Sequence, residues 1–306
     1  MRAVAAVILA TLAACDLVEG GGGLDAAAID AVPTDGYPPP LTGVVPPVGS
    51  ATTLDIACWN IENFPANANT PSLVADVIAS LDLDVIVVEE IASVAAWQEL
   101  LDRLPEHDGV LSTHVYTTTS YQKVGLIYRT ATVQVGTPEL LFIADTYAFP
   151  RPLFRVPVTV GSLTFDAIGV HFKAGGSLDD AERRAAAARV LDQHLRTTMT
   201  AGADREVIIL GDYNENLATT AGTEVMAPLL APDLYRLRTQ AEIDAGGVSF
   251  VPSGRIIDHI VTTAGLDDDT GAAAAIIPRL DVGIPRYVEQ ISDHLPVVLS
   301  IPQPAP

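Results

Sequence analysis

Six short clusters of acidic, amide and histidine residues in this 306-residue chain could do chemistry. Each lies at or beside an apolar run typical of a buried strand. The clusters are WNIEN (Asn60, Glu62), VVEEI (Glu89, Glu90), GVHFK (His171, Lys173), LGDYNEN (Asp212, Asn214), IIDHI (Asp258, His259) and ISDHLPV (Asp293, His294). Mg²⁺ and Ca²⁺ prefer carboxylate and amide oxygens as ligands, and aspartate and histidine can transfer protons. The set predicts a hydrolytic site built around a hard cation.

Taken one at a time, these residues have ordinary structural explanations. Asn60 could form a turn, Glu90 could be the solvated end of a strand, and His171 could be a hydrogen-bonded core histidine. Asp212 and Asn214 beside a glycine are common turn residues. The repetition of polar clusters after apolar runs, and not any single member, indicates a site.

A zinc site is disfavoured by the same residues. The chain has no pair of neighbouring cysteines and no helix pattern with two histidines four apart beside a glutamate. His171, His259 and His294 could bind zinc, but the aspartates and asparagines near them favour a harder cation. Cys15 and Cys58 lie in such different contexts that we expect no disulfide between them.

Strand-like and helix-like segments alternate from Thr52 onward. Continuous apolar strands are expected at 53–60, 84–90 and 206–214, and further strands at 123–130, 154–160, 163–172, 255–263 and 294–301. Helices are expected at 71–81, 92–104 and 177–199, the last with a Ser177–Asp180 capping start. Polar clusters at strand ends are where α/β sheets usually bind ligands.

The first 15 residues predict export. Arg2 precedes an apolar run too short to span a bilayer, and the run ends in Leu-Ala-Ala-Cys at Cys15. This resembles a bacterial lipobox, in which the cysteine is lipidated. A plain signal peptide is the alternative. We therefore expect residues 1–15 to be a lipoprotein signal peptide and the protein to be lipid-anchored to the cell envelope through Cys15.

Residues 16–51 are rich in glycine and proline and are expected to form a flexible tether. One catalytic domain is expected over 52–306. The formal net charge is −21, so the surface repels polyanions at long range. This argues against nucleic-acid binding by charge alone. It does not exclude an enzyme that meets phosphate through a bound cation.

Seven motifs follow one another in an order that resembles the endonuclease/exonuclease/phosphatase superfamily, which includes deoxyribonuclease-like enzymes. They are WNIENF, DVIVVEEI, FRVP, GVHFKAG, GDYNEN, IIDHI and SDHLPV, and they run from about Leu54 to Val298. The resemblance implies an α/β fold, a four-layered α/β sandwich in which two mixed β-sheets pack face to face with helices outside. It also implies a Mg²⁺-dependent phosphoric ester hydrolase, with Mn²⁺ or Ca²⁺ as alternatives.

The resemblance also assigns roles to individual residues. It places the metal at Asn60, Glu90 and Asp293. Asp212 and Asn214 would orient the attacking water and the phosphate. His294 would act as general base or bind phosphate, with Asp258 as its carboxylate partner. The substrate phosphate would further meet Arg155, Asn214 and His171, with His171 on the leaving-group side.

Two positions depart from the pancreatic-type deoxyribonucleases. Those enzymes support the second histidine with a glutamate, where the nearest residue here is Gln122. They also carry a basic residue that meets DNA phosphate where this chain has Glu62. The first departure leaves open what supports His171, and the second disfavours the same DNA contact.

From these patterns we expect a monomeric, exported phosphodiesterase that uses an activated water for in-line attack. A nuclease acting on DNA or RNA is the first hypothesis. A phosphatase or phosphodiesterase acting on a small-molecule or lipid-headgroup phosphate is the second. A surface binding protein that kept the fold without turnover is a more distant alternative, because such proteins usually lose metal or histidine positions.

Overall fold

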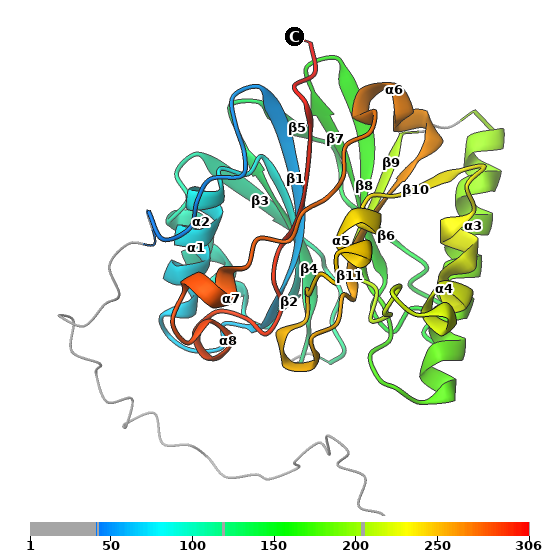
Figure 1. The fold of residues 1–306 in the computed structure, drawn as a ribbon, viewed down its shortest axis with the longest axis horizontal. Coiled ribbons are helices and arrows are strands. Elements are labelled where there is room, and N and C mark those ends of the chain that lie inside the picture. Colours follow the sequence, from blue (N-terminus) through cyan, green and yellow to red (C-terminus); the bar gives the residue numbers. More distant parts are fainter. Residues whose placement is uncertain (1–40, 42, 118–119, 203–205, 306) are drawn as a thin grey trace, which may run out of the picture. The chain divides into compact units, whose positions relative to one another are not determined.

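The computed structural model of the chain describes residues 41, 43–117, 120–202 and 206–305. The predicted lipobox cysteine, Cys15, and most of the predicted tether lie outside these residues. The part that folds together is the unit from residue 40 to residue 306 (Figure 1). No helix within the described ranges is both long and apolar enough to span a bilayer.

The first sheet is mixed. Its five strands follow the order β12 (Val297–Pro302), β1 (Thr53–Phe64), β2 (Val85–Ile91), β4 (Lys123–Arg129) and β3 (His107–Leu111). β1 and β2 pair in parallel, and the other neighbours pair antiparallel. β1 and β2 lie inside the sheet and are covered on both faces, which explains their nearly continuous burial.

The second sheet is also mixed. Its strands follow the order β10 (Tyr235–Leu237), β11 (Asp258–Thr263), β9 (Val207–Asp212), β8 (Leu163–His171), β7 (Leu153–Val160) and β5 (Val133–Val135), and β6 (Glu139–Leu141) also pairs with β7. β8 and β9 pair in parallel and the remaining neighbours antiparallel.

Helices cover the outer faces of the two sheets (Figure 1). α1 (Thr70–Leu81) and α2 (Val94–Asp102) lie on the side of the first sheet, and α3 (Leu178–Thr200) lies on the side of the second. The shorter helices and 3-10 turns are α4 (Thr220–Met226), η1 (Ala227–Leu230), α5 (Gln240–Asp244), η2 (Val251–Ser253), η3 (Ala264–Leu266), α6 (Asp267–Thr270), α7 (Leu280–Gly283) and α8 (Tyr287–Gln290). The predicted four-layered α/β sandwich is confirmed.

Two apolar cores match these layers. One lies between the sheets and continues to α1, and the other joins α3 to the outer face of the second sheet. The α3 stripe of Leu191, Leu195 and Met199 is buried in this second core. Ser177 and Asp180 form the capping box expected at the start of α3, since each side chain accepts the other's backbone N–H at 3.1 Å.

The folded unit begins earlier than the sequence predicted. Leu41 and Val45, both assigned to the tether, are buried in the core between the layers. The amides of Val48 and Gly49 donate to the carbonyl of Leu81 at 3.1 and 2.9 Å. The boundary expected at residue 52 is therefore corrected to about residue 41, because the apolar residues among the prolines cover one end of α1.

The sheets approach each other closely at Gly169 of β8. A Cβ atom at this position would lie 2.9 Å from Cγ1 of both Val87 on β2 and Val124 on β4. Real side chains do not pack at such a distance, so one sheet would have to shift.

We therefore expect Gly169→Ala to lower the free energy of unfolding by about 1–3 kcal/mol, as overpacking of a core does. Urea unfolding of the folded domain measures it. Gly176→Ala is the matched control, because an added Cβ there meets nothing within 4 Å. Equal stability of the two variants would show that the sheets are not in close contact at Gly169.

Candidate active site

Both sheets present their polar clusters at the same end. In the second sheet, Asp212 at the end of β9 lies beside His171 of the parallel strand β8 and beside Asp258 of the antiparallel strand β11. In the first sheet, Asn60 of β1 pairs with Glu89 of β2. Direct contacts join the sheets, because Asn60 Nδ2 donates to Asp212 Oδ2 at 3.2 Å. Residues up to 234 positions apart in the sequence, such as Asn60 and His294, therefore lie at this end, where Trp59 donates to the carbonyl of His294 and Ser292 to that of Asn60.

His294 and Asp258 form a buried ion pair. His294 Nδ1 lies 3.1 and 2.9 Å from the two carboxylate oxygens of Asp258. Ser249 Oγ donates to Asp258 Oδ2 at 2.6 Å and accepts the Asp258 amide at 3.0 Å, which fixes the carboxylate. The pair orients the imidazole so that its Nε2 faces Asp293, whose Oδ1 lies 3.7 Å away.

The surrounding carboxylates dominate the electrostatics of this pair. Burial alone would lower the pKa of His294, but Asp258, followed by Asp212 and Asp293, outweighs burial and raises the pKa to about 10. Burial, followed by the charge of Asp258, raises the pKa of Asp212 to about 7. At neutral pH, with no cation bound, His294 is an imidazolium and Asp212 is partly protonated.

Asp212 is 2% exposed and is held by two asparagines. Asn214 donates to it twice, from its amide N to Oδ1 at 2.7 Å and from Nδ2 to Oδ2 at 3.0 Å. Asn60 binds the same Oδ2 from the other sheet. One carboxylate therefore ties together both sheets and the loop after β9.

Glu90, Asp293 and Glu62 form an acidic group next to this network. The amide of Asn63 donates to Glu90 Oε2 at 2.9 Å, and the amide of Asp293 donates to Glu62 Oε2 at 3.1 Å. Burial raises the pKa values of Glu62 and Asp293, and repulsion from neighbouring carboxylates, Glu90 among them, raises both further. The imidazolium of His294 acts in the opposite direction and lowers both pKa values, so the carboxylates of this group share its charge.

The backbone is strained at the same place. Four non-glycine residues of the site have left-handed backbone angles, with φ of 42° at Glu62, 44° at Asn63, 64° at Glu90 and 51° at Asn214. The pairing of β1 with β2, and of β2 with β4, shifts register there. Residues other than glycine rarely adopt such angles, and they do so mostly at functional sites. The bulge turns the Glu90 side chain out of the regular strand alternation.

The donor set fits a divalent cation. Asn60, Glu90 and Asp293 offer amide and carboxylate oxygens, which suit Mg²⁺, Mn²⁺ or Ca²⁺. Asp212, Asp258 and His294 form a second group whose ligand atoms lie within 4.8 Å of one another. Glu89 is fully buried, and neither of its carboxylate oxygens has a hydrogen-bond partner among the described residues. A bound cation would offset the repulsion between these carboxylates.

His171 lies beside both Asp212 and Glu90. Its Nε2 is 3.6 Å from both Glu90 Oε1 and Asp212 Oδ2, and its buried Nδ1 has no partner within the described part of the chain. Burial, with the positive charges of Arg151 and His294, holds the pKa of His171 well below its ordinary value. His171 is therefore a neutral imidazole at pH 7.

Gln122 does not support His171. Its Oε1 accepts from Arg151 Nη2 and from the hydroxyl of Tyr116, both at 3.2 Å, and its Nε2 donates to Asn63 Oδ1 at 2.6 Å. Gln122 thus links Arg151 to the strained segment of β1. The support that the pancreatic-type enzymes give their histidine from this segment is replaced by a contact with a cation.

Arg155 is corrected: the structure places it away from the site. It lies on β7, where Phe154 and Val156 point between the sheets, so Arg155 points to the outer face. There its Nε donates to Asp166 at 2.8 Å and its Nη1 to Glu139 at 3.1 Å. Both carboxylates neutralise it, so it is not the phosphate-binding cation.

The cation that the structure places at the site is Arg151, which the sequence reasoning missed. Arg151 Nη1 donates to the carbonyls of His171 at 3.4 Å and Phe172 at 3.2 Å. It precedes β7 in the segment FPRP, which belongs to none of the seven motifs. The available signal was the place of Arg151 just before β7, at the end of that strand which pairs with Gly169 of the GVHFK motif.

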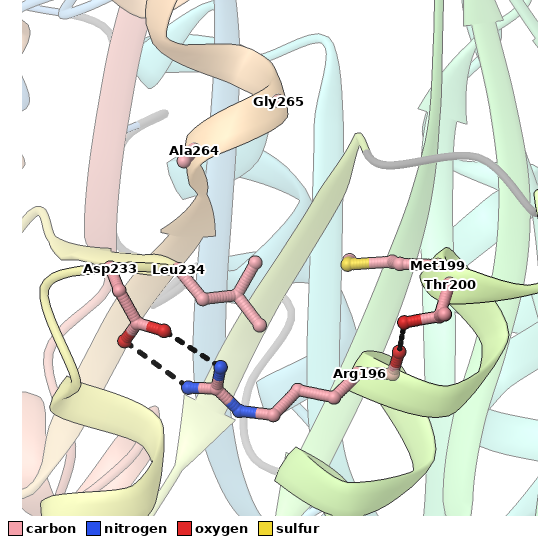
Figure 2. A pocket seen from close by; sticks show the side chains of 7 residues that line it. All are labelled: Arg196, Met199, Thr200, Asp233, Leu234, Ala264 and Gly265. Atoms are coloured by element: carbon pink, nitrogen blue, oxygen red, sulfur yellow. Dashed lines mark hydrogen bonds and ion pairs between the residues drawn. The ribbon is translucent and has the colours of Figure 1, made fainter.

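A hollow of about 530 Å³ lies elsewhere and differs in chemistry (Figure 2). Arg196, Met199 and Thr200, near the end of α3, line it together with Asp233, Leu234, Ala264 and Gly265. Arg196 binds both oxygens of Asp233, at 2.8 and 3.2 Å, so its charge is paired. Arg196 lies about 27 Å along α3 from Leu178, at 1.5 Å per residue. Leu178 begins the helix near the site, so the hollow is far from the candidate active site.

The sequence from residue 57 to residue 294 matches the family model described as "Endonuclease/Exonuclease/phosphatase family". The chain belongs to this family. Members are hydrolases that act on phosphoester bonds with a divalent metal ion, and the buried acidic and histidine group is consistent with that chemistry. No curated protein sequence matches the chain.

Solved structures of family members share this fold. Truncated TDP2 from Caenorhabditis elegans is 11% identical with a TM-score of 0.63, covering 82% of this chain and 98% of that one. TDP2 from D. rerio, solved with a single-strand DNA product, is 17% identical with a TM-score of 0.60, covering 81% and 98%. An endonuclease/exonuclease/phosphatase from Bacteroides vulgatus is 17% identical with a TM-score of 0.60, covering 83% and 100%. At these identities the likeness shows the fold alone.

The raised pKa of Asp212 predicts proton release when a divalent cation binds. A carboxyl group with a pKa of about 7 is mostly protonated at pH 6 and mostly ionised at pH 8. A bound cation favours the ionised form, so binding should release more protons at pH 6 than at pH 8. Titration calorimetry with Mn²⁺, in buffers of different ionisation enthalpy, counts them. His294 holds its proton at both pH values before binding.

Asp212→Asn is the control for this experiment, because it keeps the shape of the side chain and cannot lose a proton. The difference between the two pH values should shrink toward zero in this variant. Equal proton release by the unaltered protein at pH 6 and pH 8 would contradict the raised pKa.

Proposed function

We propose that this family member is an exported, Mg²⁺-dependent nuclease that hydrolyses phosphodiester bonds. The observation that carries the proposal is the convergence of predicted residues from five separate motifs on one end of the two sheets. Asn60, Glu90, Asp212, Asp258 and His294 all lie there, linked by the contacts given above. A protein that kept the fold only for binding would not be expected to keep every one of them.

Glu90 and Asp293, with Asn60, would hold the cation through hard oxygen ligands. When bound, a divalent cation supplies positive charge that neutralises the phosphoryl oxygens. The Asn63 amide fixes one oxygen of Glu90 at 2.9 Å and leaves the other, Oε1, facing His171. The strained bulge thereby presents one carboxylate oxygen toward the centre of the site.

Asp212 is the proposed proton acceptor for the attacking water. A bound cation lowers the pKa of Asp212 from its cation-free value of about 7, so the carboxylate is ionised at neutral pH and can accept a proton. The amide donors of Asn60 and Asn214 fix the orientation of the carboxylate. Asn214 also stands next to the carbonyl of Phe172, to which its Nδ2 donates at 3.2 Å.

His294 and His171 then have different proposed tasks. His294 is held as an imidazolium by Asp258, so its Nε2–H can donate to a phosphate oxygen as negative charge develops. His171 is neutral and can donate from Nε2 to the leaving oxygen. Arg151 adds positive charge on the His171 side of the phosphate.

The purified domain with Mg²⁺ should therefore cleave phosphoesters in an EDTA-sensitive manner. Glu90→Gln and His294→Ala should each lower the rate by ~10²-fold or more, because each removes a group that acts on the transition state. Glu99→Gln on the exposed face of α2 is the control and should be unchanged. A panel of DNA, RNA, phosphocholine esters and inositol phosphates in which nothing is cleaved would overturn the proposal.

The nature of the substrate rests on two opposing observations. TDP2 of D. rerio, which shares the fold, was solved with a single-strand DNA product, and this supports a nucleic-acid substrate. The net charge of −21 and the carboxylate of Glu62 support the second candidate, a phosphatase or phosphodiesterase acting on a small molecule or lipid headgroup. If DNA is the substrate, its cleavage should fall roughly tenfold or more between 50 and 200 mM salt, while cleavage of a small diester should not.

We also propose that the protein is exported and lipid-anchored through Cys15 as a monomer. The support is the short apolar run that ends in Leu-Ala-Ala-Cys, followed by a glycine-rich and proline-rich stretch. Metabolic labelling with a palmitate analogue in a bacterial host is the test. Cys15→Ser should abolish both the label and membrane association. Equal labelling of the variant would exclude this anchor.

A further inference from the structure

The loop after His171 is held by side chains from outside it. Arg184 of α3 is 4% exposed, and its Nη1 donates to the carbonyls of Lys173 at 2.8 Å and Gly175 at 2.9 Å. Its Nε donates to Glu215 Oε2 at 2.8 Å. Glu215 directly follows Asn214 in the loop after β9. One buried guanidinium therefore forms hydrogen bonds to both loops that carry residues of the site.

The same two loops are connected a second time, closer to the site. Arg151 binds the carbonyls of His171 and Phe172, and Asn214 Nδ2 donates to the carbonyl of Phe172 at 3.2 Å. The amide of Phe172 donates to the carbonyl of Asp212 at 2.9 Å. The pairing of β8 with β9 sets His171 beside Asp212. The contacts of Phe172 with Asn214, and of Arg184 with both loops, set where Asn214 lies relative to that pair.

The loop after β9 is also anchored beyond Glu215. The carbonyl of Glu215 lies 3.1 Å from His259 Nε2, and His259 Nδ1 lies 2.9 Å from Thr239 Oγ1. Burial lowers the pKa of His259 to about 4, so this fully buried ring is neutral at physiological pH. Its Nε2 can donate to the Glu215 carbonyl while Nδ1 accepts from the hydroxyl. This contact holds the Glu215 backbone while Arg184 holds its side chain.

We propose that Arg184 is a positioning residue for the proposed hydrolysis, which sets the position of Asn214 relative to His171 and touches none of the reacting atoms. A planar guanidinium suits this task, because it offers several donors in fixed directions and keeps its charge when buried. The hydrogen bonds described for Arg184 all end on the two loops. The anchoring of α3 itself rests on its capping box and its apolar stripe.

The test compares Arg184→Ala with Arg189→Ala, which removes an exposed arginine from the same helix. We expect Arg184→Ala to lower kcat by ~10- to 100-fold, since a misplacement of about 1 Å has an effect of this size. KM and the affinity for Mn²⁺ should change less than about threefold, because the cation donors Asn60 and Glu90 lie on the first sheet, whereas the hydrogen bonds of Arg184 end on loops of the second. Arg189→Ala should leave all three unchanged.

Chemical rescue separates positioning from folding. Guanidinium chloride at low millimolar concentration should restore part of the kcat of Arg184→Ala, because the ion can occupy the vacated space between the loops. It should not restore His171→Ala. A kcat per folded molecule equal to that of the unaltered protein would overturn the inference, and so would a loss that follows the unfolded fraction and does not respond to guanidinium.

This inference rests on the proposed function, and the two can fail separately. If the unaltered protein cleaves no phosphoester, the proposed function fails. Hydrogen exchange of residues 172–176 and 213–216 then still tests the clamp. Arg184→Ala should speed exchange in both loops together, whereas exchange that is unchanged, or faster in only one of them, would overturn the coupling that Arg184 provides.

Discussion

Repulsion between buried carboxylates is the constraint on which the rest of this structure depends. Asp212, Asp258, Glu89 and Glu90 lie where two sheets meet. After burial, the charges of Asp258, Asp212 and Glu90 raise the pKa of Glu89, and the charge of Asp258 raises the pKa of Asp212. Charges of like sign can be held this close only by a rigid frame and by positive or dipolar partners. His294, the amides of Asn60 and Asn214, and the backbone N–H groups that meet Glu90 and Asp212 are those partners.

The fold supplies the frame through strands that are covered on both faces. β1, β2 and β9 cannot slip in register without exposing apolar residues. The same register sets His171, Asp212 and Asp258 side by side. The two sheets also approach each other closely at Gly169, and the amide of Asn60 crosses between them to Asp212. The accuracy of the site is therefore a property of the core.

Much of this could be predicted from the sequence. Long buried strands and α3 were clear, since continuous apolar runs and a capping box are local signals. The short strands β3, β5, β6 and β10 were not, because edge strands of three to five residues are partly exposed and carry no distinct period. The meeting of the site residues could be predicted because their polar clusters follow apolar strands and because the motifs occur in the family's order. Arg155 was wrongly assigned because the family motif was followed, although strand alternation puts Arg155 opposite Phe154 and Val156. Arg151 lies before β7, where no strand period indicates its direction. Arg184 gave no signal beyond its place in a helix rich in alanine and arginine.

The left-handed residues at Glu62, Asn63, Glu90 and Asn214 have a consequence for how this chain can change over evolution. Each left-handed conformation destabilises the fold by on the order of 1 kcal/mol relative to glycine at the same position. At Glu62, Glu90 and Asn214, however, the side chain is what binds a neighbour in the site. Substitutions that favour robustness and substitutions that favour the proposed chemistry therefore compete at the same positions. In a descendant released from selection for turnover, we expect glycine to replace these residues first. Substitution of the site histidines would follow later.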